Sequence, residues 1–150
     1  MADTFTSLHY HVVFSTKGRE PWLRLDMQER VWAYLGGIAR QNQLRPLLIG
    51  GTEDHIHVLL GIPPTVAVSE ALKRIKGGSS GWIKQNIRGC RGFGWQDGYG
   101  AFTVSKSQDA QVKAYISKQR QHHRKKNFQE EYRALLDRHE IEYDERHLWD

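Results

Sequence analysis

Hydrophobic and polar residues alternate along four short segments, and this period of two predicts four β-strands. The segments are residues 7–16, 44–50, 51–61 (entered through a tight turn at 51–54) and 99–105. In the first segment Val12 and Phe14 share one face, and His9 and His11 share the other. Proline cannot donate a hydrogen bond to a neighbouring strand, so Pro46 places the second strand at a sheet edge or at a bulge.

Between and after the strands, apolar residues recur at the spacing of an amphipathic helix. Helices are predicted at residues 21–41, 65–88, from Ser107 or Asp109 to about 126, and, as a short acidic helix, near 128–139. Gly77 and Gly78 interrupt the second helix, where each glycine costs about 1 kcal/mol relative to alanine. They indicate either a kink or a place where a DNA backbone approaches closely.

The first six predicted elements run strand, helix, strand, strand, helix, strand. This order is the βαββαβ pattern of a ferredoxin-like sandwich, an α+β fold with an antiparallel four-stranded sheet. In that topology the first and third strands are central neighbours. The pairs His9, His11 and His55, His57 are therefore expected to lie close together.

At 150 residues the chain is expected to form a single domain, with a core at about 7–126 and a C-terminal extension at about 127–150. Its one cysteine, Cys90, excludes an internal disulfide and fits a reducing compartment. We find neither a long apolar run nor a signal-peptide pattern, so a cytoplasmic protein without membrane association is expected.

The net charge of +5 is unevenly distributed. Residues 73–91 hold six basic and no acidic side chains, and residues 106–126 hold seven basic and one acidic. Residues 129–150 reverse the balance, with eight acidic and three basic. Either basic run alone is more often a solvated helix face, but two of them suggest a surface for a polyanion such as nucleic acid.

The segment at 51–61 carries the clearest candidate chemistry. His55 and His57 are two residues apart on a strand, so they share a face with Cα atoms roughly 6.6 Å apart. Two imidazoles so placed can converge on one metal ion. Two half-exposed polar residues are the commoner explanation of such a pair, so other ligands have to be found.

The predicted third helix offers them. Tyr115 and Gln119 are four residues apart and are expected on one helix face. Tyr115 is a candidate nucleophile, although a lone helical tyrosine is usually a core residue. Gln119 offers an amide oxygen as a third metal ligand.

The ordered set of Asp54-His55-Ile56-His57, Tyr115-x-x-x-Gln119 and the opening His9-Tyr10-His11 resembles the single-tyrosine HUH transposases, including their REP-associated relatives. The resemblance covers nearly the whole chain. It implies that His55, His57 and Gln119 hold one Mg²⁺ or Mn²⁺ and that Tyr115 attacks a phosphodiester of single-stranded DNA. A 5′-phosphotyrosine would form, and rejoining would need no ATP.

The resemblance further implies a homodimer that acts on hairpin-bearing single-stranded DNA, with Tyr115 able to serve the histidine pair of the other subunit. The C-terminal part of this chain would then carry the catalytic tyrosine on a helix, and the acidic tail would follow that helix. Candidate DNA contacts are the histidines, lysines, arginine and serines of the basic segments: His9, His11, Lys17, Arg19, Lys73, Lys76, Ser79, Ser80, Lys84, Lys118, His122 and His123. His9 and His11 fit support of the metal ligands equally well.

Three other interpretations compete. A domesticated relative would act on repeated palindromic sequences rather than on its own element. A non-catalytic nucleic-acid-binding module would be expected to carry stacking aromatics on the central strands, where this chain has histidines. A zinc protein would prefer more cysteine or histidine ligands than a glutamine allows.

Overall fold

A computed structural model describes residues 2–119, 123 and 126–150. Its strands are β1 (His9–Ser15), β2 (Arg45–Gly51), β3 (His55–Gly61) and β4 (Gly100–Val104). Its helices are α1 (Leu25–Gln41), α2 (Val68–Asn86), α3 (Asp109–Ser117) and α5 (Phe128–Arg138), with 3-10 turns η1 (Lys17–Arg19) and η2 (Lys106–Gln108). The element order is the expected βαββαβ pattern followed by a C-terminal extension.

The four strands form one antiparallel sheet in the order β2-β3-β1-β4, which confirms the ferredoxin-like topology. β1 and β3 are central neighbours, with His57 opposite Val13 and His55 opposite Ser15. β2 lies at an edge of the sheet, and its register shifts between Pro46 and Leu48. The edge position and the irregularity, which Pro46 predicted as alternatives, therefore both occur.

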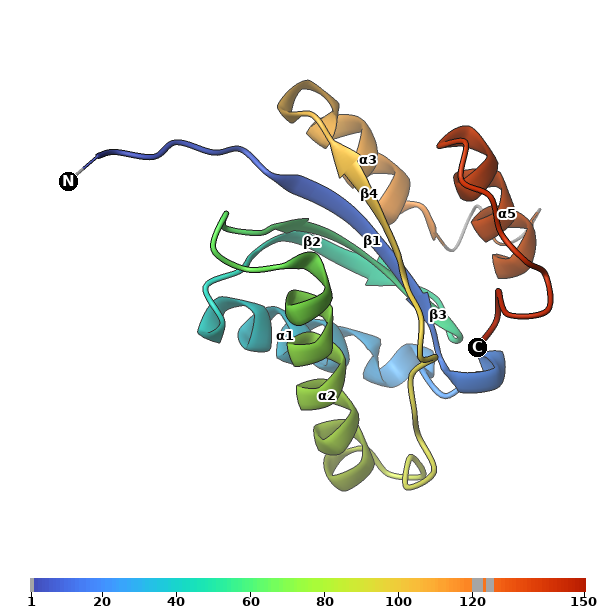
Figure 1. The fold of residues 1–150 in the computed structure, drawn as a ribbon. Helices are drawn as coiled ribbons and strands as arrows, with labels where there is room; N and C mark the ends of the chain where they lie inside the picture. Colours follow the sequence, from blue (N-terminus) through green and yellow to red (C-terminus); the bar gives the residue numbers. More distant parts are fainter. Residues whose placement is uncertain (1, 120–122, 124–125) are drawn as a thin grey trace.

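Each face of the sheet is covered by helices, which gives two hydrophobic cores (Figure 1). α1 and α2 cover one face, where Val12 and Phe14 are buried. α3 and α5 lie over the other face, where Val13 and Phe102 pack against apolar residues of α5. The acidic tail folds back onto this second core, because Trp149 contacts the rings of Phe128 and Tyr132.

Two helices differ from the predicted ones. α1 begins at Leu25 rather than at residue 21, because the preceding segment is held extended by a hydrogen bond from Leu23 N to Glu53 O. α2 runs through Gly77 and Gly78 without a break, so the prediction of a kink at these glycines is wrong. A Cβ at Gly78 would lie 3.1 Å from the side chain of Ile38, so this glycine permits close packing between α2 and α1.

No helix in the described part of the chain is long and apolar enough to cross a membrane.

The hairpin that presents His55 depends on a glycine. A Cβ at Gly51 would lie 2.3 Å from His55 O and 2.9 Å from Ile56 Cα, and backbone atoms cannot move aside cheaply. We expect Gly51→Ala to lower the free energy of unfolding by about 2–3 kcal/mol, measured by urea denaturation.

Gly77→Ala is the matched control for this substitution. Nothing lies within 4 Å of a Cβ at Gly77, and the position is exposed on a helix. Alanine should therefore raise the free energy of unfolding by up to about 1 kcal/mol. Equal stabilities for the two variants would contradict the hairpin geometry described here.

Candidate metal centre and nucleophile

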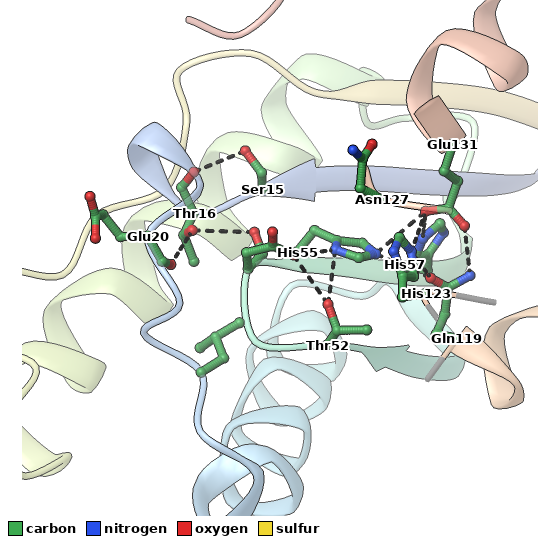
Figure 2. A network of polar contacts seen from close by, with 12 residues as sticks. Ser15, Thr16, Glu20, Thr52, His55, His57, Gln119, His123, Asn127 and Glu131 are labelled. Atoms are coloured by element: carbon green, nitrogen blue, oxygen red, sulfur yellow. Dashed lines mark hydrogen bonds and ion pairs between the residues drawn. The ribbon is translucent and has the colours of Figure 1, made fainter. Parts of the chain in front are cut away.

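His55 and His57 project from β3 into the layer between the sheet and α5, where both are fully buried. The Nε2 atoms of both rings point toward one carboxylate: His57 Nε2 lies 3.0 Å and His55 Nε2 3.4 Å from Glu131 Oε1. Figure 2 shows Glu131 reaching these rings from α5. The two histidines therefore converge, as their spacing on a strand predicts.

Each histidine is held by its other ring nitrogen. His55 Nδ1 lies 2.7 Å from Asp54 Oδ1 and 3.0 Å from Thr52 Oγ1. His57 Nδ1 lies 2.7 Å from His11 Nε2. With the proton on Nδ1, each ring directs the Nε2 lone pair into the cluster, which is the orientation that a metal-ligating histidine needs.

Gln119 supplies an amide to the same cluster. Its Oε1 lies 3.1 Å from His55 Nε2, and its Nε2 donates to Glu131 Oε2 over 3.0 Å. Gln119 is almost fully buried, so its amide contacts residues of the cluster rather than solvent. His123 joins from the same segment, with its Nε2 3.1 Å from both Gln119 Oε1 and Glu131 Oε1.

Tyr115 lies beside the cluster within the same chain. Its ring centroid is 5.8 Å from that of His57 and 6.0 Å from that of His11, and its hydroxyl donates a hydrogen bond to Glu131 Oε2. The predicted helix is interrupted, because α3 ends at Ser117 and Lys118 caps it. Residues 120–122 and 124–125 of the predicted helix lie outside the described residues. Tyr115 and Gln119 both bind Glu131 Oε2, although they do not lie on one continuous helix.

Burial and hydrogen bonding together set the charges of the cluster. Burial alone would lower the pKa of His55, but hydrogen bonds to the carboxylates of Asp54 and Glu131 raise it to about 9. Burial, only partly opposed by Glu131, lowers the pKa of His57 to about 4. Burial would raise the pKa of Glu131, yet hydrogen bonds from His123, His55 and His57 hold it far below its usual range.

The pKa of the Tyr115 phenol is shifted upward, in contrast to that of Glu131. Burial and the negative charge of Glu131 both raise the pKa of Tyr115 above its usual value. In the protein alone the cluster therefore contains a carboxylate, a protonated His55 and a neutral phenol. A cation at this position would take over the role of the His55 proton as a partner of Glu131.

Glu131 is the residue that the sequence analysis missed. It lies on α5 between Phe128, Tyr132 and Leu135, so it occupies the buried apolar stripe of that helix. A carboxylate on a buried stripe is rarely left without partners, and this pattern could have identified it. Asp54 was noted only as part of the histidine motif, and Thr52 offered no signal.

The other predicted contacts divide into three groups. His9 is buried and hydrogen-bonded to Asp109, and His11 is bound to His57, so their placement favours structural support over contact with DNA. Ser79 is fully buried, where its hydroxyl donates to Ile75 O and accepts from Trp95 Nε1, so it is not available to DNA.

Several of the basic candidates come together. An open groove of about 640 Å³ along α2 and the loop before β4 is lined by the following members of the predicted set: Lys17, Lys73, Lys76, Ser80 and Lys84.

The remaining members lie elsewhere. Lys118 is exposed at the end of α3, and the guanidinium of Arg19 lies 5.5 Å from the Trp149 ring. His123 is part of the cluster, and His122 lies outside the described residues.

A ferredoxin-like sheet here brings two imidazoles, an amide, a carboxylate and a phenol together, a set of groups that could hold a divalent cation beside a candidate nucleophile. The chain belongs to the IS200-like transposase family, whose profile, described as "Transposase IS200 like", matches residues 4–119. It is therefore a transposase.

Similar proteins carry names from that family. The ISDra2 transposase TnpA of Deinococcus radiodurans is 30% identical over 119 residues, which is 75% of this chain and 84% of that protein. The transposase for insertion sequence element IS200 of Salmonella typhimurium is 33% identical over 126 residues, which is 79% of this chain and 81% of that protein.

Two solved structures share the fold. A crystal structure of a Deinococcus radiodurans R1 protein assigned as a transposase superposes with a TM-score of 0.64 at 27% identity, covering 79% of this chain and 95% of that chain. A REP-associated tyrosine transposase bound to a REP hairpin superposes with a TM-score of 0.59 at 12% identity, covering 82% and 74%.

Proposed function

We propose that this transposase cuts and rejoins single-stranded DNA through a covalent bond to Tyr115, with one divalent cation held beside it. The observation that carries the proposal is the meeting of Tyr115 with the histidine pair and Gln119 around one buried carboxylate. These residues come from β3, α3, the segment after α3 and α5, so only the folded chain brings them together.

The donor set fits Mg²⁺ or Mn²⁺. His57 would present an Nε2 lone pair, and so would His55 once its Nε2 proton has left. Gln119 would present an amide oxygen and Glu131 a carboxylate oxygen, and the His55, His57 and Glu131 ligand atoms lie within 4.8 Å of one another. Carboxylate and amide oxygens are donors that suit Mg²⁺ and Mn²⁺. When bound, the ion would polarise a phosphate oxygen and balance the charge of the transition state.

The protein's own residues would carry out the bond exchange. Tyr115 Oη attacks the phosphorus, the bond from phosphorus to the 3′ oxygen breaks, and a 5′-phosphotyrosine and a free 3′-hydroxyl result. The phenol proton leaves along its hydrogen bond to Glu131, and the departing 3′ oxygen takes up one proton. A second 3′-hydroxyl reverses the exchange, so the phosphodiester energy is conserved.

The groove along α2 is the proposed site for the DNA backbone. Four lysines line it, and its open shape admits a phosphate chain. Lys76 is the least available, because it donates to Asp97 O and Gly98 O, and burial lowers its pKa to about 8. The structural neighbour bound to a REP hairpin supports a hairpin as the folded part of the substrate.

We further propose that the protein works as a homodimer. In the single chain Tyr115 already lies against its own His57, so the cluster forms in cis in this conformation. Exchange of the segment that carries Tyr115 between two subunits would recreate the same contacts in trans.

The test is a covalent adduct. The protein is mixed with a labelled pool of hairpin-bearing single-stranded DNAs, with and without Mg²⁺ or Mn²⁺, and resolved under denaturing conditions. We expect a denaturant-resistant adduct that requires the ion and disappears with a chelator. Tight binding over a broad pool without any adduct would refute strand transfer and favour a binding module.

A further inference from the structure

A cavity of about 440 Å³ opens beside the candidate nucleophile, between β4, α3 and α5. Tyr115 and His11 form part of its wall, so the cavity adjoins the metal cluster, whose Glu131 binds Tyr115 and whose His57 binds His11. Its volume lies in the range of small-molecule sites. Neither the metal cluster nor the lysine groove accounts for it.

The chemistry of the wall is mixed in a specific way. Phe102, Val104, Val112 and Leu135 give it apolar surface, and the ring of His139 stacks on Phe102 with centroids 4.5 Å apart. A flat, aromatic ligand would bury well against such a wall.

Polar groups occur at defined places on the same wall. The amides of Gln108 and Gln111 are exposed on the η2–α3 side, where they can pair with the edge of a base. Arg138 contributes an exposed guanidinium from α5, and no carboxylate among the described residues forms an ion pair with it. A free guanidinium next to a nucleophile suits a phosphate.

We propose that this cavity, named here the Gln111 pocket after its exposed amide, holds the unpaired base of the nucleotide next to the scissile phosphate. The inference rests on the proposed function. The base lies on the apolar wall, the amides of Gln108 and Gln111 bind its edge, and Arg138 faces the adjoining phosphate. The pocket would fix the phosphate in front of Tyr115 and contribute to the choice of cleavage site.

The experiment removes the base from the DNA and the pocket from the protein. Oligonucleotides carry an abasic residue at each position flanking the mapped cleavage site, and every position is measured in two ways. The first measurement is the rate of adduct formation by the unsubstituted protein. The second is the equilibrium affinity of Tyr115→Phe, which binds without reacting.

We expect about a tenfold loss at one flanking position and less than twofold at the others. Val112→Trp fills the pocket and should erase the position-specific loss, so that abasic and intact DNA behave alike. Gln111→Ala, on an exposed side chain that folding does not need, should reduce the preference among the four bases at that position. Gln41→Ala, an exposed glutamine on α1, is the matched control and should retain both effects.

The outcomes separate this inference from the proposed function. An adduct that forms with no position-specific loss would overturn the pocket and leave strand transfer intact. A position-specific loss of affinity without any adduct would retain the pocket and refute strand transfer. A loss that persists unchanged in Val112→Trp, and a base preference that persists in Gln111→Ala, would place the base elsewhere and overturn the pocket.

Discussion

Replacing Tyr115 by phenylalanine is expected to abolish the covalent adduct with DNA, with a loss of at least about 10³-fold in the rate of its formation. Removal of the attacking group from an enzyme that uses one has effects of this order or larger. The substitution removes one oxygen and keeps the ring that packs near His57 and His11. Adduct formation is measured on denaturing gels with labelled single-stranded DNA.

The matched control for this prediction is Tyr132→Phe. Tyr132 is a buried tyrosine of α5, next to Glu131 in the sequence, and its ring packs against Phe128. We expect this variant to form the adduct at a rate close to that of the unsubstituted protein, and both variants to melt within a few degrees of it. An undiminished adduct in Tyr115→Phe would show that another side chain attacks the phosphorus.

The topology and the histidine pair could be predicted because they depend on short-range patterns. Strand alternation fixes which side chains share a face, and the order of elements fixes which strands are neighbours. For this reason the approach of His11 to His57 follows from the sequence once the βαββαβ order is recognised.

The rest of the site depends on contacts between segments that are far apart in the chain. The end of α3 at Ser117 has no proline or glycine to announce it, and a periodic pattern therefore predicts a helix that is too long. The carboxylate of Glu131 enters the cluster because Phe128, Tyr132 and Leu135 dock α5 on the sheet. The acidic composition of residues 129–150 conceals this one buried carboxylate among exposed ones.

Replacing Glu131 by glutamine is expected to weaken Mn²⁺ binding by at least about tenfold, measured by calorimetry or by the spin-resonance signal of the free ion. Glutamine keeps the shape and removes the charge that faces His55 and His57. A carboxylate contributes a full negative charge to a divalent ion, whereas an amide contributes only a dipole. The unfolding temperature without metal should also fall, because the protonated His55 loses a buried partner.

Two companion variants make the result of this substitution decisive. Glu130→Ala removes the exposed neighbouring carboxylate and should change neither quantity, so it controls for a general effect of charge. Gln119→Ala tests the ligand that the sequence indicates.

Equal losses of Mn²⁺ affinity in Glu131→Gln and Gln119→Ala would show that both side chains hold the ion, as their distances to the histidine rings suggest. A loss in Gln119→Ala alone would restrict Glu131 to pairing with the histidines and Tyr115. Unchanged affinity in both variants would contradict the proposed ligand set, in which Gln119 and Glu131 supply the oxygen donors.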